Sequence, residues 1–467
     1  MTDRINGFFS GIKDKRIAFV GFGESHNRLI ELMAKKGFDI TVCDRLRRDA
    51  IGSICDSFER LGVRLCLGEN YLDCLDYADI IFRTPGMYYH SPALSKARKA
   101  GKTVTSETEV FFDLCPCPIY AVTGSDGKTT TATLIYEILT AAGKRAHIGG
   151  NIGKALLCDI ESIGSDDIVV AELSSFQLIS MRSSPHVAVV TNISPNHLDV
   201  HKDMDEYTEA KRNILLHQNA FSRTVLNEDN ETAFGLKKYV RGELVTFSRK
   251  SVPSSGAYLN DEGYICVVTG GSETKILHCD EIRLPGKHNA ENYLAAISAV
   301  WPSVGIDAIR KVALEFGGVE HRLEFVDEID GVKWYNDSKA TTPTGTIACL
   351  DSFNRKIILI AGGYDKKTSY DPLAPKIIEN VKTLVLIGQT AQAIEKAVVD
   401  CEGYRHNLIK ILHANSMGEA VKLARSEAQD GDIAVLSPAS ASFGMFTNFA
   451  HRGEVYKEIV KNLKEQI

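Results

Sequence analysis

A short apolar run that leads into two glycines and a lysine constrains the fold of this chain more than any other segment. Residues 119–122 have the composition of a buried strand, and apolar side chains recur at helical spacing between Ala132 and Leu139. The segment between them, Thr-Gly-Ser-Asp-Gly-Lys-Thr-Thr at 123–130, therefore joins a strand to a helix. Such a junction is typical of an α/β fold with a parallel sheet.

This strand-to-helix junction has the features of a phosphate-binding loop. The first N–H groups of a helix lack internal partners, and glycines let the backbone approach an anion closely. Lys128 adds a positive charge, and Thr129 offers a hydroxyl to Mg²⁺. Two residues separate the glycines, which is shorter than in a standard Walker A loop. We predict a phosphate site rather than a purely structural turn, formed by Gly124, Asp126, Gly127, Lys128, Thr129 and Thr130.

The length and composition indicate a globular protein of several domains. The 467 residues exceed one ordinary core, 24% of them are charged, and no apolar run is long enough to span a bilayer. The net charge of −6 argues against a nucleic-acid surface, and the N-terminus lacks the apolar stretch of a secretory signal. We therefore expect a cytoplasmic monomer that binds neither nucleic acid nor membrane and whose 11 cysteines are reduced.

The chain is predicted to form three domains, at residues 1–107, 108–317 and 318–467. The first opens with a strand and a glycine turn at 16–23, and its second strand ends at Asp44, where an acidic ribose partner would lie. The dinucleotide fingerprint is incomplete, because His26 occupies the position of the third glycine. We therefore expect a ligand smaller than a dinucleotide, with the loop at 84–86 on the same edge of the sheet.

The second predicted domain places polar residues after its strands. Glu172 ends an apolar strand at a position suited to a Mg²⁺ ligand that faces the phosphate loop, although a solvated cap gives the same pattern. His197 follows the next strand, and by itself it is compatible with a ligand or with a satisfied polar residue. Lys211 is interpreted as a surface lysine of a helix, and residues 222–280 as irregular strands and turns with little chemistry.

The third predicted domain repeats the alternation of strands and helices. Apolar strands in the segments 357–363, 383–388 and 433–438 each lead into a small or turn-forming residue, which is the pattern of a doubly wound sheet. Residues 336–339, Asn-Asp-Ser-Lys, have a common turn composition. Their chemistry depends on neighbours that the composition does not reveal.

Taken together, the motifs resemble the Mur ligases of peptidoglycan synthesis over essentially the whole chain. Each motif is weak alone, but their joint order is specific: GSDGKTT at 124–130, GGNIG at 149–153, ELSSFQL at 172–178, NISPNHLD at 192–199, KHNAEN at 287–292, HRLE at 321–324, NDSKAT at 336–341, GGYDK at 362–366 and SPASASF at 437–443. The resemblance implies a central P-loop ATPase-type domain between two Rossmann-like domains. It also implies a ligase in which ATP phosphorylates a carboxylate and an amine then displaces the phosphate.

The resemblance extends to the substrates and to individual residues. Relatives that add a diamino acid carry Asp-x-Pro-Arg in the last domain, and its absence here favours the members that join D-glutamate to UDP-N-acetylmuramoyl-L-alanine. By resemblance, Lys128 would hold the ATP phosphates, Thr129 and Glu172 a first Mg²⁺, and His197 with a carbamylated Lys211 a second Mg²⁺. The adenine, phosphates and ribose of ATP would contact, in turn, Asn289, Arg322 and Asp337. The D-glutamate pocket would comprise Lys339, Thr341, Lys366, Ser437 and Phe446. The UDP-sugar would contact Gly23, Ser25, Asp44, Arg45, Thr84, Pro85 and Gly86, and nearer its reacting end Asn151, Ser174 and His197. Asp126 departs from the pattern, since many relatives have Asn there.

Two other kinds of function remain open on the sequence. A ligase of the same fold with another acceptor, such as an L-alanine-adding or folylpolyglutamate-forming enzyme, would keep the ATP residues and change the last-domain pocket. A nucleotide-binding regulator without catalysis, or a dinucleotide-dependent oxidoreductase, would explain the first glycine turn. The joint presence of Lys128, Glu172, His197 and Lys211 argues against the regulator, and the missing third glycine argues against the oxidoreductase.

Overall fold

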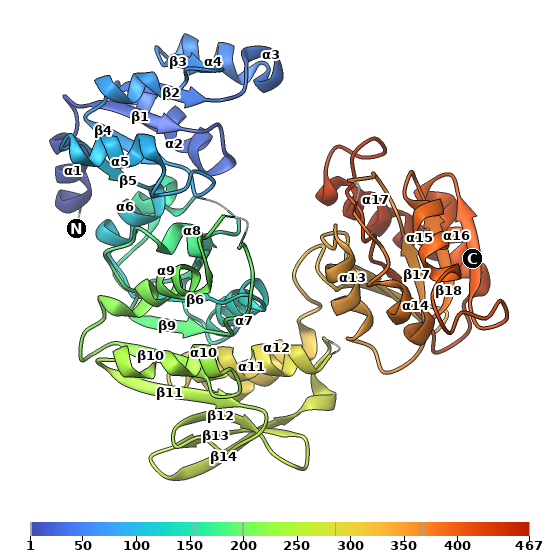
Figure 1. Cartoon of the computed structure of the whole chain (residues 1–467). Helices are drawn as coiled ribbons and strands as arrows, with labels where there is room; N and C mark the ends of the chain where they lie inside the picture. The colour runs from blue at the N-terminus through green and yellow to red at the C-terminus, as the bar shows by residue number, and fades with distance from the viewer. Residues whose placement is uncertain (1, 154, 199, 285, 367, 467) are drawn as a thin grey trace. The chain divides into compact units, whose positions relative to one another are not determined.

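The computed structural model describes residues 2–466 except 154, 199, 285 and 367, and it divides the chain into two compact units (Figure 1). Unit 1 comprises Met1–Cys279 and Glu291–Val312, and unit 2 comprises Asp280–Ala290 and Ala313–Ile467. Unit 1 contains two sheets and unit 2 contains one, so the α/β fold class is confirmed. The predicted division into three domains stays a prediction.

The first sheet of unit 1 has five parallel strands in the order β3-β2-β1-β4-β5. The strands are β1 (Arg16–Val20), β2 (Asp39–Asp44), β3 (Arg64–Leu67), β4 (Ile80–Arg83) and β5 (Thr103–Thr105). The helices are α1 (Thr2–Gly11), α2 (Glu24–Lys35), α3 (Arg48–Ile51), α4 (Ile54–Arg60), η1 (Asp73–Tyr77) and α5 (Pro92–Lys99). Because β1 pairs with both β2 and β4, the loops that follow these three strands meet at one edge of the sheet.

Two cysteines of this first sheet correct the prediction that all cysteines are reduced. Cys43, near the end of β2, is joined by a disulfide to Cys74 of η1, and the other nine cysteines are free. Both sulfur atoms lie in one small apolar cluster with Val20 and Leu75. The element η1 packs against β1, the strand beside β2, and this contact places Cys74 near Cys43.

The second sheet of unit 1 has nine strands in the order β14-β13-β12-β11-β10-β9-β6-β8-β7. These are β6 (Ile119–Thr123), β7 (Ala146–Gly150), β8 (Ile168–Glu172), β9 (Val187–Val190), β10 (Arg223–Asn227), β11 (Glu243–Ser248), β12 (Gly256–Leu259), β13 (Tyr264–Thr269) and β14 (Ser272–His278). The helices between and after them are α6 (Glu107–Leu114), α7 (Lys128–Ala141), η2 (Leu156–Ser162), α8 (Ser175–Leu178), α9 (Met204–Leu216), α10 (Glu231–Phe234), η3 (Gly235–Tyr239), η4 (Cys279–Glu281), α11 (Lys287–Val300) and α12 (Ile306–Glu315).

The prediction of strands within residues 222–280 is confirmed, but their description as irregular is wrong, because five strands of this sheet lie there together with α10 and η3. β10 to β12 continue the parallel pairing from β9, and β13 and β14 close the edge as an antiparallel hairpin. The sequence carried a signal for the hairpin: Gly270 and Gly271 both adopt positive φ, 58° and 79°, as a two-residue hairpin turn requires. The parallel strands are short and buried on both faces, so they lack the alternation that marks a half-buried strand.

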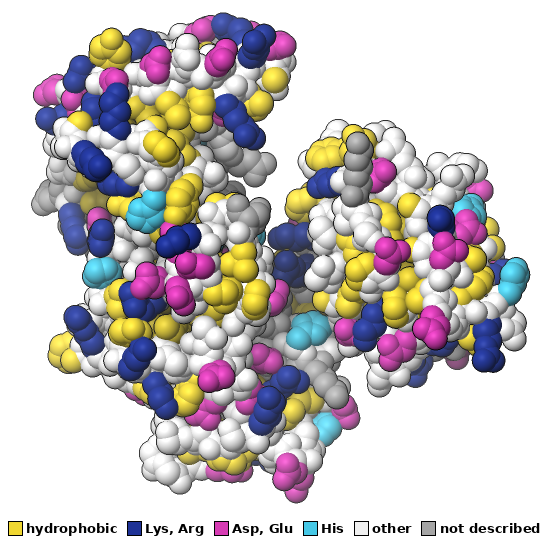
Figure 2. Space-filling model, viewed as in Figure 1, with side chains coloured by type: hydrophobic (Ala, Val, Ile, Leu, Met, Phe, Trp, Pro, Cys, Tyr) yellow, Lys and Arg dark blue, Asp and Glu magenta, His cyan; other side chains and the backbone are white. Residues whose placement is uncertain are grey.

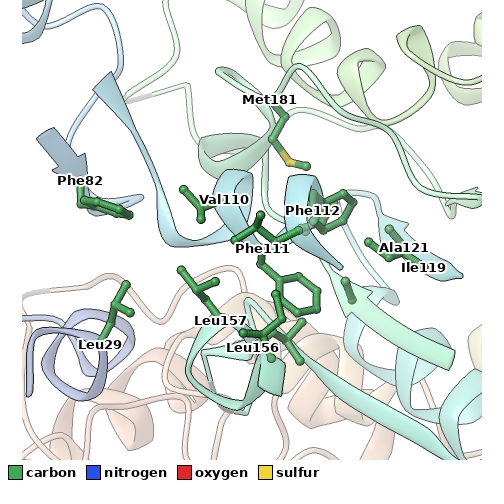
Figure 3. Close-up of a cluster of buried hydrophobic side chains, with 14 of the residues drawn as sticks. Leu29, Phe82, Val110, Phe111, Phe112, Ile119, Ala121, Leu156, Leu157 and Met181 are labelled. Atoms are coloured by element: carbon green, nitrogen blue, oxygen red, sulfur yellow. The ribbon is translucent and has the colours of Figure 1, made fainter. Parts of the chain in front are cut away.

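The two sheets of unit 1 share one apolar core, which α6 bridges. Figure 3 shows Val110, Phe111 and Phe112 of α6 between Phe82 on one side and Ala121 on the other. All five side chains are buried. This continuous core fixes the edge loops of the first sheet relative to the central sheet, where the phosphate loop lies.

Unit 2 is a doubly wound sheet, as the sequence predicted, in the order β15-β16-β20-β17-β18-β19. Its strands are β15 (Glu324–Ile329), β16 (Val332–Asn336), β17 (Ile357–Ala361), β18 (Val381–Ile387), β19 (Lys410–Ala414) and β20 (Ile433–Leu436), of which only β15 runs antiparallel. Its helices are α13 (Pro343–Leu350), α14 (Ala374–Asn380), α15 (Ala391–Val399), α16 (Met417–Glu427), α17 (Phe449–Asn462) and η5 (Leu463–Gln466). Apolar clusters on both faces of the sheet, one around Leu359 and one around Trp334, form its core.

The surface of each unit mixes charges of both signs. On the face shown in Figure 2, lysines and arginines are interspersed with aspartates and glutamates in both units. Among the described residues, no helix is both long and apolar enough to cross a membrane.

Candidate active site

The predicted phosphate loop lies between β6 and α7, and its two glycines are sterically required. Gly127 is the N-cap of α7 with φ 76°, and a Cβ added there would lie 2.3 Å from Asn292 Oδ1. A Cβ on Gly124 would lie 1.9 Å from Thr191 Oγ1. Lys128 Nζ donates to the Ser125 carbonyl at 2.9 Å, so the lysine folds back over the loop. The loop is therefore a tightly packed cradle whose next residues begin a helix, as anion binding requires.

Asp126, where the sequence departs from many relatives, acts in this loop through its backbone. Its N–H donates to Asn192 Oδ1 at 2.9 Å, and its carbonyl accepts from Thr191 Oγ1 at 2.6 Å. The Asp126 side chain itself is exposed. The added negative charge therefore faces solvent, where water screens it.

A hydroxyl, a carboxylate and an amide meet beside the phosphate loop. Thr129 Oγ1 donates to Glu172 Oε2 at 2.7 Å, and Asn151 Nδ2 donates to Glu172 Oε1 at 2.7 Å. Glu172 is buried at the end of β8, and the parallel pairing of β8 with β6 sets it opposite Val122. Hard oxygen ligands of this kind suit Mg²⁺. The structure thus brings Thr129 and Glu172 together, as the sequence predicted, and it adds Asn151, which was expected nearer the reacting end of the UDP-sugar.

Lys211 corrects the interpretation of a surface lysine, because it is 1% exposed. Its Nζ donates to the Gly124 carbonyl at 2.6 Å and lies 4.7 Å from the centre of the Tyr207 ring. Burial, with a smaller contribution from the nearby charge of Lys128, lowers the pKa of Lys211 well below its usual value. The sequence held a signal for this position: Tyr207, Ala210, Lys211 and Ile214 share the apolar face of α9.

His197 lies on a short aromatic stack that the sequence did not predict. Its ring centroid is 5.0 Å from that of Phe176 in α8, and the ring of His201 stacks on Phe176 at 5.1 Å. His201 Nε2 lies 2.9 Å from Ser175 Oγ, and burial lowers the pKa of His201. Ser174 caps α8 by accepting from the Gln177 N–H at 3.2 Å. Phe176 thus links the helix that follows Glu172 to both histidines.

The predicted UDP-sugar residues of the first sheet lie after β1, β2 and β4. Asp44 is buried, and its carboxylate accepts from the N–H groups of Phe22 and Leu46 at 2.9 and 2.8 Å. It therefore holds its own turn and the neighbouring glycine turn in place. Gly23 precedes α2, Arg45 and Gly86 are exposed, and Thr84 and Pro85 are half-buried. The side chain of Ser25 lies outside the described residues.

A cavity of about 480 Å³ in unit 1 connects predicted residues of both sheets. Pro85 and Asn151 line it together with residues that were not predicted as ligand contacts: His26, Arg28, Arg83, Ser106, Glu107, Thr108, Gly150, Gly153, Ala155 and Gln177. Burial lowers the pKa of His26 to about 4 and raises that of Glu107 to about 7. The Ser-x-x-Glu pattern at 106–109 signals the start of α6, and such a signal could have located this cavity wall.

Unit 2 brings together the NDSKAT and SPASASF motifs. Asp337 is buried, and it accepts from Ser437 Oγ at 2.7 Å and from the Leu323 N–H at 3.2 Å. Burial raises the pKa of Asp337 to about 6. Buried Arg452 donates to the carbonyls of Ser338 and Ser440 at 2.8 and 3.0 Å, which ties the two motifs to each other.

The remaining predicted residues of unit 2 differ in exposure. Lys366 is exposed and lies 5.9 Å from the Phe443 ring centre, whereas Lys339, Thr341 and Arg322 are half-buried. The remaining two are Phe446, which packs against the core cluster of Trp334, and Asn289, which is buried in the N-terminal segment of the unit. Their contacts with ligands stay predictions.

Comparisons with known proteins agree with this arrangement and define a class of ATP-dependent, amide-forming ligases. Residues 122–300 match the Mur ligase middle domain, and residues 321–440 match the Mur ligase, glutamate ligase domain. The chain belongs to the Mur ligase family.

The curated relatives narrow the comparison within this family. The UDP-N-acetylmuramoylalanine--D-glutamate ligase of Acetivibrio thermocellus is 52% identical over 99% of this chain and all of the relative. The ligase of the same name from Clostridium kluyveri is 48% identical with the same coverage. Among solved structures, the UDP-N-acetylmuramate-alanine ligase of Thermotoga maritima matches with a TM-score of 0.59, 18% identity and coverage of 97% and 100%. At that identity the match shows the fold alone.

Proposed function

We propose that this chain adds D-glutamate to the alanine carboxylate of UDP-N-acetylmuramoyl-L-alanine, with conversion of ATP to ADP and phosphate. The observation that carries the proposal is the cluster of Thr129, Glu172 and Asn151 beside the phosphate loop. Buried Lys211 of α9 donates to the Gly124 carbonyl of the same loop. The names of relatives at 45–52% identity over the full length support the choice of substrates.

The reaction has two steps that the residue types suit. A carboxylate oxygen attacks the γ-phosphorus of ATP, the bond to the bridging oxygen breaks, and ADP leaves. The deprotonated amine of D-glutamate then attacks the acyl carbon, and inorganic phosphate leaves. Because the first step brings two anions together, cationic groups must lower their repulsion, and Lys128 holds such a charge at the loop.

The residues present fit a first Mg²⁺. Thr129 and Glu172 would hold it, since a hydroxyl and a carboxylate that already lie 2.7 Å apart are oxygen ligands of the preferred type. When bound, the ion supplies positive charge beside the transferred phosphoryl group. Lys128 and the N-terminus of α7 orient that group through contacts of the chain itself.

A second Mg²⁺ and a carbamate on Lys211 form the finer part of the proposal. Addition of CO₂ to a neutral amine gives a carbamate and releases one proton. Burial lowers the pKa of Lys211, and this shift favours the neutral amine that the addition needs. The modification would convert a cation into an oxygen ligand, and His197 would be the other ligand from this chain. Tyr207 and Gly124 already position the lysine side chain against the loop.

The remaining parts of the proposal concern organisation. We assign the UDP-sugar to residues 1–107 and D-glutamate to residues 318–467, with Lys339 and Lys366 as cations for its two carboxylates. The buried Asp337–Ser437 pair would hold the wall of that pocket. We also propose that the enzyme is monomeric and cytoplasmic. Size-exclusion chromatography with light scattering tests the oligomeric state.

Phosphate release is the direct test. The enzyme is incubated with ATP, Mg²⁺ and UDP-N-acetylmuramoyl-L-alanine, and D-glutamate, L-glutamate, L-alanine or no amino acid is added. Release only with D-glutamate, with a product of the matching mass, is the expected result. Release with another amino acid would retain the ligase chemistry and overturn the acceptor, and no release with any acceptor would overturn the proposal.

A further inference from the structure

Arg83 connects the first sheet to the central sheet of unit 1 at the cavity wall. It is the last residue of β4, directly before the loop 84–86, and its side chain is 1% exposed. One guanidinium nitrogen, Nη2, donates to the Phe176 carbonyl at 2.7 Å and to Ser180 Oγ at 2.7 Å. The other, Nη1, reaches the Met87 carbonyl at 3.4 Å. A residue of the first sheet is thus hydrogen-bonded to α8, the helix that follows β8 of the central sheet.

The guanidinium lies in a buried polar network rather than in a simple ion pair. Ser180 Oγ donates to Glu109 Oε2 at 3.1 Å, and Ser106 Oγ donates to the same oxygen at 2.9 Å. Arg83 and Glu109 are therefore joined through the Ser180 hydroxyl. Burial of a charge without direct pairing is expensive, and Arg83 Nε is buried with no hydrogen-bond partner among the described residues. Such an arrangement calls for a role beyond packing.

The residue that Arg83 holds also supports the histidines of the site. Phe176 contributes the carbonyl that Arg83 binds, and its ring meets the His197 ring edge to face and stacks on the His201 ring. A shift of the loop 84–86 would move Arg83, and α8 is too short, at four residues, to absorb the shift internally. The movement would therefore reach the ring of His197.

We propose that Arg83 is a positioning residue that couples occupancy of the nucleotide-sugar loop 84–86 to the placement of His197. The inference rests on the proposed function, because that function assigns the uridine diphosphate to this loop. Arg83 does not touch the reacting atoms, and it acts through Phe176. Removal of the guanidinium should separate binding of the nucleotide from the chemical step.

The test compares Arg83→Gln with Arg98→Gln in the full chain. Arg98 is a matched control, because Arg83 and Arg98 both lie over the Tyr89 ring, at 5.5 and 4.0 Å from its centre. Unlike Arg83, Arg98 donates to the Tyr89 carbonyl and not to α8. We expect kcat of Arg83→Gln to fall by about tenfold or more, because His197 loses its alignment. The KM for D-glutamate should stay within about threefold of the wild-type value. Added guanidinium ion should restore part of kcat in Arg83→Gln and none in the control.

A spectroscopic readout tests the coupling without turnover. The histidines are labelled with ¹³C, His197 and His201 are assigned by substitution, and UDP is added. In the wild type and in Arg98→Gln, UDP should shift both histidine signals, whereas in Arg83→Gln the shifts should be lost although UDP still binds. Unchanged kcat and retained histidine shifts in Arg83→Gln would overturn the inference.

Two further outcomes separate this inference from the proposed function. A wild type that binds UDP, shows the histidine shifts and releases no phosphate would refute the proposed function and leave the coupling standing. If Arg83→Gln does not fold, Ser180→Ala replaces it, since it removes one of the two acceptors at 2.7 Å and leaves the arginine in place. It should give a smaller loss of kcat and weaker histidine shifts, and wild-type values of both would again overturn the coupling.

Discussion

Glu107 provides a quantitative test of the cavity wall, because its carboxyl group is buried and forms no ion pair with any of the residues that the structure describes. It is 6% exposed and accepts from the Leu157 N–H at 2.7 Å. Burial raises its pKa from 4.5 to about 7, so between these values the folded protein keeps a proton that the unfolded chain has released. The free energy of unfolding must therefore fall as the pH rises through this window, and the loss is complete above the folded pKa.

The size of this effect follows from the two pKa values. Ionisation of Glu107 should lower the free energy of unfolding by about 2.5 kcal/mol between about pH 5 and about pH 8. Glu107→Gln keeps an oxygen acceptor for the Leu157 N–H and removes the titration. The stability of Glu107→Gln relative to the wild type should therefore rise by about 2.5 kcal/mol over the same interval.

The two tryptophans allow unit 1 to be followed separately. Trp301 lies in unit 1 and Trp334 in unit 2, so a Trp334→Phe background reports urea unfolding of unit 1 by fluorescence. Glu161→Gln, which removes an exposed carboxylate paired with Lys36, serves as the control for loss of one negative charge. The quantity compared is the rise in the free energy of unfolding of each variant, relative to the wild type, between about pH 5 and about pH 8. If this rise is larger for Glu107→Gln than for Glu161→Gln by less than about 0.5 kcal/mol, the buried protonated state of Glu107 is refuted.

The remaining predictions concern the phosphate loop and Lys211. Gly127→Ala should destabilise the protein by at least about 1 kcal/mol more than Gly143→Ala, and only the former should weaken ATP binding, measured by calorimetry. Gly143 is matched because its φ is 77° and nothing lies within 4 Å of an added Cβ, so equal losses would show that Asn292 yields to the new methyl group. Lys211→Ala should lower kcat by about a hundredfold or more, with partial return on addition of acetate, whereas Lys202→Ala, at an exposed lysine, should retain activity. Full activity of Lys211→Ala would remove this lysine from the mechanism.

The parts of the site that lie at strand ends could be predicted from the sequence. Lys128, Thr129 and Glu172 follow or end apolar runs, and neighbouring parallel strands bring their carboxyl ends to one edge of the sheet. The ladder of hydrogen bonds fixes this alignment, so a local pattern is enough to place the residues. The same reasoning placed the loop 84–86 and Asp44 at one edge of the first sheet.

The parts that lie on helices and bridging side chains could not be placed in this way. A lysine on an otherwise apolar face of α9 has no charged partner that the sequence reveals, so composition favoured the surface. Arg83 is separated from Phe176 by 93 residues, and His201 meets Ser175 across 26. Contacts of this range depend on how the two sheets of unit 1 pack, and no periodicity in either segment encodes that packing.

The difference between these two groups bears on how the site works. The groups to which we assign the ATP phosphates lie at strand ends or directly after them, where the pairing of the strands sets their positions. Lys211 and Phe176 instead belong to the helices α9 and α8, and His197 belongs to a loop. The positions of these elements depend on side-chain contacts, among them the hydrogen bond from Arg83 to the Phe176 carbonyl. The loop 84–86, to which we assign the nucleotide-sugar, directly follows Arg83 and is thereby joined to this second group. Occupancy of that loop should therefore change the position of the histidine side chains. The affinity for ATP alone should stay the same, because the groups that we assign to the phosphates are anchored by the sheet.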